Sequence, residues 1–315
     1  MHSIRPGGVA DLPAICDLWN VVWPHHFRGL EEMGRELELP KVECRPQFLL
    51  IEKDGQLLGA AEFNRDYGSY HPQKWSLSLS VLPAYRQMGF GSALLDSMLA
   101  TIEAEGAISA DCRVSDEDTG SIQFVEKRGF LEIKRDFESE LDLSQVGEEL
   151  LGTVVDCPAT IRSMKEVDSP EFRQEFHQAF EAIRIDTPRT DPPTQLEFDH
   201  FQALIIDDPD FLPEASRVAL INGRLAGFTG LFKMEQPGSL FQWLTGVRRE
   251  HRGKKIAKAL KLDALRWAVA SGYKTIRTDN DTRNAPMLAI NDQLGFRRLP
   301  GMITYRRELG AEARG

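Results

Sequence analysis

The residues best suited to chemistry lie in a short loop that contains two glycines. A run of alternating residues ends at Val81, and R-Q-M-G-F-G follows from Arg86 to Gly91. Backbone N–H groups at the start of a helix have no partner within the helix, and the helix dipole favours negative charge there. Glycine lets an anion approach the backbone closely. The segment predicts a loop that holds a pyrophosphate, but a glycine-rich turn into an ordinary amphipathic helix has the same pattern.

The same pattern recurs later in the chain. Val247, Arg252 and Ala257 each lie 166 residues after their counterparts in the first loop. The same shift carries Gly129-Phe130 onto Gly295-Phe296 without a gap. Because self-similarity at a fixed offset is the signature of a repeated fold, the sequence predicts two domains of one fold in tandem.

Both halves predict strands followed by a helix. In the first half, two apolar runs joined by Asp54-Gly55 predict a hairpin, and the second half has Asn222-Gly223 at the equivalent turn. The predicted strands are 48–52, 57–63, 75–81, 218–221, 225–232 and 240–247, and the predicted helices are 91–105 and one ending near 272. We expect an α/β (α+β) fold, a mixed and mostly antiparallel sheet flanked by helices, in domains 1–150 and 151–315.

Composition argues against several classes of protein. The chain of 315 residues has a net charge of -10, which opposes non-specific binding to nucleic acid or anionic membranes. No apolar run reaches the roughly 18 residues that cross a bilayer. The four scattered cysteines and the pair His25-His26 lack metal-ligand spacing, so we expect no metal and a cytoplasmic location.

One segment of the chain is basic despite the negative net charge. It adjoins the second loop, which favours a small polyphosphate ligand over DNA, although a solvated helix face is the alternative. Its members are Arg248, Arg249, Arg252, Lys254, Lys255, Lys258 and Lys261.

On these motifs the sequence resembles the GNAT superfamily of N-acetyltransferases, whose signature is R/Q-x-x-G-x-G/A after a splayed strand, with a later Gly-Phe turn. The resemblance covers both halves, most specifically residues 75–130 and 240–296, and the tandem arrangement is similar to that of mycothiol synthases. It implies acetyl-CoA as cosubstrate, with pantetheine along the strand, pyrophosphate on the loop amides and the Val81 N–H on the thioester carbonyl. Such an N–H stabilises an oxyanion.

The resemblance also implies which residues contact acetyl-CoA in each half. In the second half, Lys255 replaces the loop glycine, and Asn284 is expected to touch the arm of the cosubstrate. The first set is Val81, Arg86, Gln87, Met88, Gly89, Gly91 and Ser92, and the second is Val247, Arg252, Gly253, Lys254, Lys255, Ala257, Lys258 and Asn284.

The residues that would donate or accept protons match the family pattern less well than the loop does. Many relatives carry a tyrosine four residues before a Gly-Phe turn, but this chain has Val125 and Asn291 near those points. Asn291 could still form a hydrogen bond with the CoA thiolate. Glu62 is the candidate general base of the first half, with a surface carboxylate as the alternative, and ordered water or Asp279 is the candidate in the second.

The resulting expectation is an enzyme that transfers an acetyl group directly from acetyl-CoA to a primary amine of a small molecule. We expect no nucleic-acid or membrane partner, and a monomer or homodimer. A non-catalytic acyl-CoA sensor and a protein or peptide N-acetyltransferase are the alternatives, because one fold of this kind hosts many acceptors.

Overall fold

The protein is described by a computed structural model over residues 2–24, 27–38 and 41–310. The pair His25-His26 lies outside the described residues. Within these ranges, no helix is long and apolar enough to cross a membrane.

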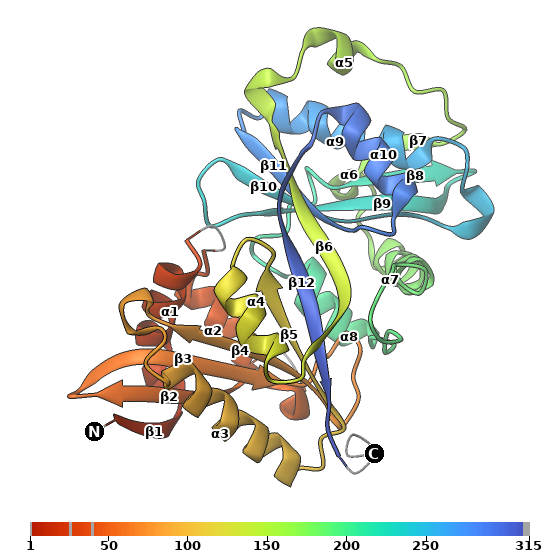
Figure 1. Cartoon of the computed structure of the whole chain (residues 1–315). Coiled ribbons are helices and arrows are strands. Elements are labelled where there is room, and N and C mark those ends of the chain that lie inside the picture. The colour runs from red at the N-terminus through yellow and green to blue at the C-terminus, as the bar shows by residue number, and fades with distance from the viewer. Residues whose placement is uncertain (1, 25–26, 39–40, 311–315) are drawn as a thin grey trace. The chain divides into compact units, whose positions relative to one another are not determined.

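The chain divides into two compact units (Figure 1). Unit 1 comprises residues 1–134 and 302–315, and unit 2 comprises residues 135–301. These limits differ from the expected boundary near residue 150, because strands β6 (Leu131–Asp142) and β12 (Arg297–Glu308) each begin in one unit and end in the other.

Unit 1 is a sheet with helices on both faces. Its strands lie in the order β1-β2-β3-β4-β5-β12. All neighbours are antiparallel except β4 and β5, which are parallel. Its elements are β1 (His2–Gly7), α1 (Leu12–Val22), α2 (Leu30–Glu38), β2 (Gln47–Lys53), β3 (Gln56–Asn64), β4 (Lys74–Val81), α3 (Phe90–Ala104), β5 (Ser109–Ser115) and α4 (Thr119–Glu126).

The alternation of strand side chains divides the core of unit 1 between the two faces. Phe48, Leu50 and Ala60 pack with α1 and α2 on one face. Ala61 and Phe63 lie on the other face, in the cluster that contains the apolar residues of α3. The sheet is therefore buried on both sides, as the apolar strands of the sequence predicted.

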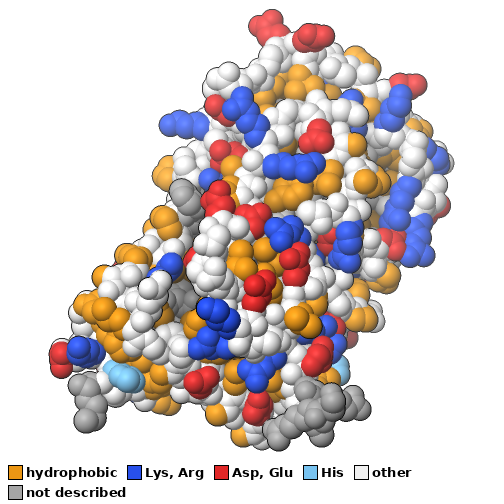
Figure 2. All heavy atoms as spheres, viewed as in Figure 1, with side chains coloured by type: hydrophobic (Ala, Val, Ile, Leu, Met, Phe, Trp, Pro, Cys, Tyr) orange, Lys and Arg blue, Asp and Glu red, His pale blue; other side chains and the backbone are white. Residues whose placement is uncertain are grey.

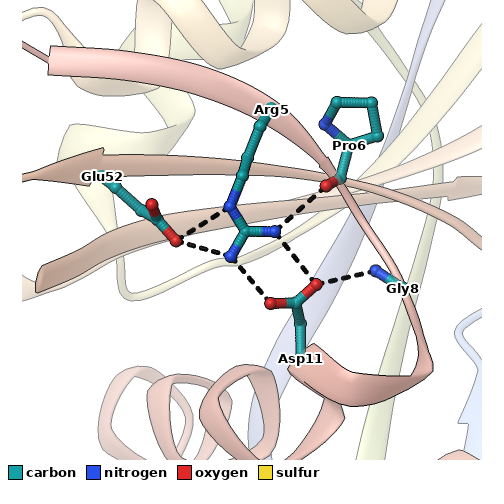
Figure 3. Close-up of polar contacts among 5 residues, drawn as sticks. All are labelled: Arg5, Pro6, Gly8, Asp11 and Glu52. Carbon is teal, nitrogen blue, oxygen red and sulfur yellow. Dashed lines mark hydrogen bonds and ion pairs between the residues drawn. The ribbon is translucent and has the colours of Figure 1, made fainter. Parts of the chain in front are cut away.

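An ionic cluster fixes the edge of this sheet to the start of α1 (Figure 3). The Arg5 guanidinium donates to both carboxylate oxygens of Asp11 (2.7 and 3.0 Å) and to Glu52 on β2. The Gly8 N–H also donates to Asp11. The hydrogen bond from Arg5, followed by that from Gly8, lowers the pKa of Asp11 to about 2.

Unit 2 repeats this architecture. Its strands lie in the order β6-β11-β10-β9-β8-β7, with β10 and β11 parallel. The apolar residues of α7 and α8 form one core cluster and those of α9 another. Its elements are α5 (Glu148–Gly152), β7 (Thr160–Ser163), α6 (Met164–Val167), α7 (Pro170–Arg184), α8 (Phe198–Phe201), β8 (Arg217–Ile221), β9 (Arg224–Lys233), β10 (Ser239–Val247), α9 (Ile256–Ala270), β11 (Thr275–Asp281) and α10 (Ala285–Leu294).

The last strand of each repeat completes the sheet of the other unit. β12 pairs with β5 from Met302 to Glu308, and β6 pairs with β11 from Asp136 to Asp142. Arg306 on β12 holds Asp111 of β5 through two hydrogen bonds of 2.7 and 2.8 Å. The mixed sheets and the tandem organisation expected from the sequence are confirmed.

Candidate active site

Strands β4 and β5 separate in unit 1. Their pairing ends at Leu77, while β4 stays paired with β3 as far as Val81. The Leu82 N–H donates to the Leu58 carbonyl on β3 (2.9 Å). Because N–H groups alternate along a strand, those of Leu79 and Val81 face the gap left by β5. The sequence indicated Val81 but not Leu79.

The predicted loop of unit 1 has the geometry of an anion cradle. Gly89 adopts a φ of 89° as the N-cap of α3, and its carbonyl accepts the first helical bond from Ala93 (3.0 Å). The N–H groups of Phe90, Gly91 and Ser92 therefore precede the helical bonding pattern and are available to an anion.

Two arginines supply positive charge beside this cradle. Arg86 donates to the Val81 carbonyl and forms an ion pair with Asp118, both at 3.4 Å. Arg128 donates to the Ser92 hydroxyl and lies over the Phe124 ring at 3.9 Å. The sequence analysis did not assign Arg128, although its place next to the Gly-Phe turn was a usable signal.

A cavity of about 70 Å³ opens within unit 1 at this gap. It is bounded mainly by apolar side chains of β4, β5, α3 and α4, which suits the arm of a thioester better than a charged group. The lining includes Leu77, Leu79, Leu95, Met98, Val114 and Val125. At its border, the Trp23 indole donates to the Ser80 hydroxyl (3.1 Å).

Glu62, the candidate base, lies on β3 opposite Ser78 of β4 and is engaged in an ion pair. Its carboxylate accepts from Arg28 at 3.0 Å, and Arg28 also contacts Glu36. The Arg28 guanidinium lies 4.8 Å from the centre of the Trp19 ring. A base at Glu62 would act from within this ion-paired group, which the sequence did not indicate.

The gap recurs in unit 2. Pairing between β10 and β11 ends at Phe241 and Arg277, while β10 continues beside β9 to Val247 after a bulge. The Arg248 N–H donates to the Ala226 carbonyl (2.8 Å), so the Val247 N–H faces away from β9, as its counterpart Val81 faces away from β3.

The two loops exchange the position of their glycine. The backbone is left-handed at Gln87 (φ 62°) and Gly89 in unit 1, and at Gly253 (φ 75°) and Lys255 (φ 58°) in unit 2. A side chain in this region costs roughly 1 kcal/mol. Lys255 therefore keeps the backbone shape of the glycine it replaces, and its carbonyl caps α9 by accepting from Ala259 (3.1 Å).

The sequence has more lysines and arginines around the second loop than around the first. Figure 2 shows the Lys and Arg side chains of one face in blue. Arg252 donates to the Val247 carbonyl (2.9 Å), and Arg249 and Arg252 both contact Asp186. The hydrogen bond from Arg249 is the largest of the influences that hold the pKa of Asp186 well below its usual value. Lys258 donates to Gln293 (2.9 Å).

Lys261 does not belong to this surface cluster, contrary to the sequence analysis. Its side chain is 1% exposed, and its Nζ donates to Gln242 Oε1 of β10 at 2.6 Å. The ammonium lies 5.2 Å from the centre of the Phe296 ring. Burial lowers the pKa of Lys261 to about 7, while the charge of Asp279 acts in the opposite direction.

Two asparagines of unit 2 occupy different environments. Asn284 is the N-cap of α10 and accepts from the Met287 N–H at 3.4 Å. Asn291 is 2% exposed and donates through Nδ2 to Asn280. Its Oδ1 has no hydrogen-bond partner among the described residues. This orphan acceptor leaves Asn291 able to receive a hydrogen bond from a ligand. Over the same residues, no cluster of His, Cys, Asp or Glu could hold a metal ion.

Comparisons with known proteins agree with this geometry. The model of the acetyltransferase (GNAT) family matches residues 12–130 and 170–296, and the chain belongs to that family. No curated protein sequence matched the chain.

Solved structures share the fold at low sequence identity. A tandem GNAT protein from the clavulanic acid biosynthesis pathway is 18% identical with a TM-score of 0.77, covering 99% of both chains. A GCN5-related N-acetyltransferase from Sphaerobacter thermophilus is 19% identical with a TM-score of 0.74, covering 98% of this chain and 95% of its own. The glucosamine N-acetyltransferase region of a fungal multi-domain β-N-acetylglucosaminidase is 15% identical with a TM-score of 0.72, covering 97% of this chain and 38% of its own.

Proposed function

We propose that the protein transfers an acetyl group from acetyl-CoA to a primary amine of a small molecule. The observation that carries this proposal is the combination, in each unit, of a splayed strand and a helix that begins directly after an anion-binding loop. The loop suits a pyrophosphate, and the open edge of the strand suits the amides of a pantetheine arm.

The proposed chemistry is direct transfer. The amine nitrogen attacks the thioester carbonyl, the carbonyl oxygen gains negative charge, and the carbon–sulfur bond then breaks. Fixed N–H groups such as those of Leu79 and Val81 would stabilise that oxygen, and one such donor commonly contributes about 3 kcal/mol to the transition state.

A small amine is the acceptor class that an acidic group on β3 and α2 of unit 1 favours. Glu62 and Glu36 flank Arg28, so the group carries a net negative charge that attracts an ammonium ion. The related fungal region is described as a glucosamine N-acetyltransferase, and glucosamine is also a small amine.

Titration calorimetry with acetyl-CoA tests the proposal. Gly91→Glu and Ala257→Glu place a carboxylate at equivalent positions in the first turns of α3 and α9. A Cβ at Gly91 would meet only ordinary contacts, 3.5 Å or more, with Leu79 and Phe124, so the backbone should tolerate the change. We expect each substitution to abolish binding in its own unit. Absence of acetyl-CoA binding by the unaltered protein would refute the proposal.

An acyl-CoA sensor remains a second candidate for unit 1 in particular. Most side chains that line its cavity are apolar, and Val125 lies where many relatives carry the tyrosine that protonates the thiolate. Tight binding of acetyl-CoA without acetylation of any member of a broad amine panel would favour the sensor over the enzyme.

A further inference from the structure

A buried cation lies at the apex of the gap in unit 2. The last pair between β10 and β11 joins Phe241 to Arg277, and Gln242 is the next residue along β10. Lys261 donates to the Gln242 side chain at this point. We propose that Lys261 is the acid that protonates the CoA sulfur, so that unit 2 carries out the transfer. This inference rests on the proposed function.

The position of Lys261 along α9 suits this role. It lies five residues after Ile256, about 7.5 Å along the helix from the end that would hold the pyrophosphate. The open part of β10, from Gln242 to Val247, spans about 17 Å. An arm that follows this edge from the loop and presents its thioester to the N–H of Thr245, the counterpart of Leu79, directs its sulfur toward the apex, where the ammonium lies.

A purely structural lysine is a costly choice at this site. Burial of a cation is unfavourable unless it is paired. The hydrogen bond of Lys261 goes to the neutral amide of Gln242, and the charge of Asp279 offsets only part of the effect of burial on the pKa of the lysine. Unit 1 has the apolar Leu95 at the equivalent position of the same fold. The fold therefore does not require a charge there. Buried titratable groups with shifted pKa values occur often at functional sites.

Polar neighbours orient the ammonium. Gln242 donates through Nε2 to the Thr229 hydroxyl (3.1 Å), which contacts the Thr245 hydroxyl (2.7 Å). This chain fixes Gln242 with its oxygen toward Lys261. On α10, the buried Oδ1 of Asn291, which has no partner among the described residues, offers an acceptor to a ligand N–H or S–H group.

The proton transfer balances. A bond forms between the amine nitrogen and the acetyl carbon, the carbon–sulfur bond breaks, and the sulfur takes the proton of the Lys261 ammonium. The proton lost by the amine passes to water, and Lys261 is reprotonated after CoA leaves. Burial lowers the pKa of Lys261 to about 7, which makes it a stronger acid than an exposed lysine at neutral pH.

The decisive experiment compares CoA with desulfo-CoA by calorimetry, in a Gly91→Glu background that removes the donor site of unit 1. A charge-assisted contact with the sulfur should make CoA bind about ten- to a hundredfold more tightly than desulfo-CoA. Lys261→Met and Lys261→Gln should lose this preference but keep the affinity for desulfo-CoA, which shows that the site is still folded. Lys233→Met, at an exposed lysine of β9, is the matched control and should retain the preference.

Acetyl transfer from acetyl-CoA to hydroxylamine supplies the kinetic arm. We expect kcat of both Lys261 variants to fall by about a hundredfold or more, with little change in KM. The pH profile of the rate should also lose the titration of the acidic group. An unchanged sulfur preference and rate would overturn the role of Lys261 and leave the proposed function standing. If the Gly91→Glu variant fails to bind CoA while the unaltered protein binds it, the role of Lys261 is likewise overturned and the proposed function stands. Failure of the unaltered protein to bind CoA would overturn both.

Discussion

At the scale of single residues, the two units differ most at one buried position of the shared fold. Leu95 and Lys261 occupy equivalent positions in α3 and α9, and both are buried. The sequence analysis placed Lys261 on the surface because it follows a run of exposed cations in the loop and at the helix start. Charge type alone could not reveal that this residue lies on the face of α9 that contacts β10.

The buried lysine should make stability depend on alkaline pH. Its pKa is lowered from 10.5 to about 7 in the folded protein, so the unfolded chain binds more protons between these values. Stability should therefore rise with pH across that window, by on the order of 2–4 kcal/mol between pH 7 and 10 relative to Lys261→Met. Urea unfolding at a series of pH values, with Lys233→Met as the control, measures the difference. Parallel pH curves for wild type and Lys261→Met would contradict the lowered pKa of Lys261 in the folded protein.

At the scale of elements, helix α7 depends on a missing side chain in β10. A Cβ at Gly246 would lie 2.1 Å from Cγ2 of Ile183, which is far inside any real contact. The glycine therefore allows α7 to approach the strand backbone at the open end of the second gap. A glycine in a strand commonly marks such a close approach.

Gly246→Ala should accordingly be destabilising, by about 1–3 kcal/mol, because Ile183 or the strand must move. Ile183→Ala alone should cost about 2–5 kcal/mol through the cavity it leaves. The double variant should cost less than the sum, since the new methyl group fills part of that cavity. Unfolding free energies of the four proteins form the test, and simple additivity would rule out the contact.

Sequence patterns predicted the strands and helix next to each loop but only part of the site. Strands β2 to β4 and β8 to β10 and helices α3 and α9 follow from hydrophobic period, and the turns at Asp54-Gly55 and Asn222-Gly223 adopt the left-handed conformation that those residues favour. The loop amides were found by their glycines. The ion pair of Glu62 with Arg28 was not, because it joins residues 34 positions apart.

At the scale of the whole molecule, the internal repeat of the sequence did not predict that the last strands are exchanged. β6 and β12 are equivalent segments of the two repeats. β6 pairs with β11 and β12 pairs with β5, and β11 and β5 are also equivalent. Exchanged and unexchanged pairings therefore present nearly the same side-chain pattern. An internal repeat predicts two folds but not which copy supplies which strand.

Removal of residues 302–315 should damage unit 1 rather than unit 2. The deletion takes Ile303, Tyr305 and Leu309 from the core of unit 1 and exposes the edge of β5. Limited proteolysis with mass spectrometry should show cleavage within residues 2–134 while residues 135–301 stay protected. A chain ending at Gly310 keeps β12 and serves as the control. Equal protection of both units in the truncated chain would contradict the assignment of β12.

The strand exchange also sets an order of events during protein synthesis. Domains usually fold from the N-terminus as the chain leaves the ribosome. Here the continuous segment 135–301 is complete before the second part of β12 has been translated, whereas unit 1 needs residues 302–308 to close its sheet. The half encoded first is therefore the half that finishes last, and until residues 302–308 pair with β5 its edge is open to nascent chains on neighbouring ribosomes.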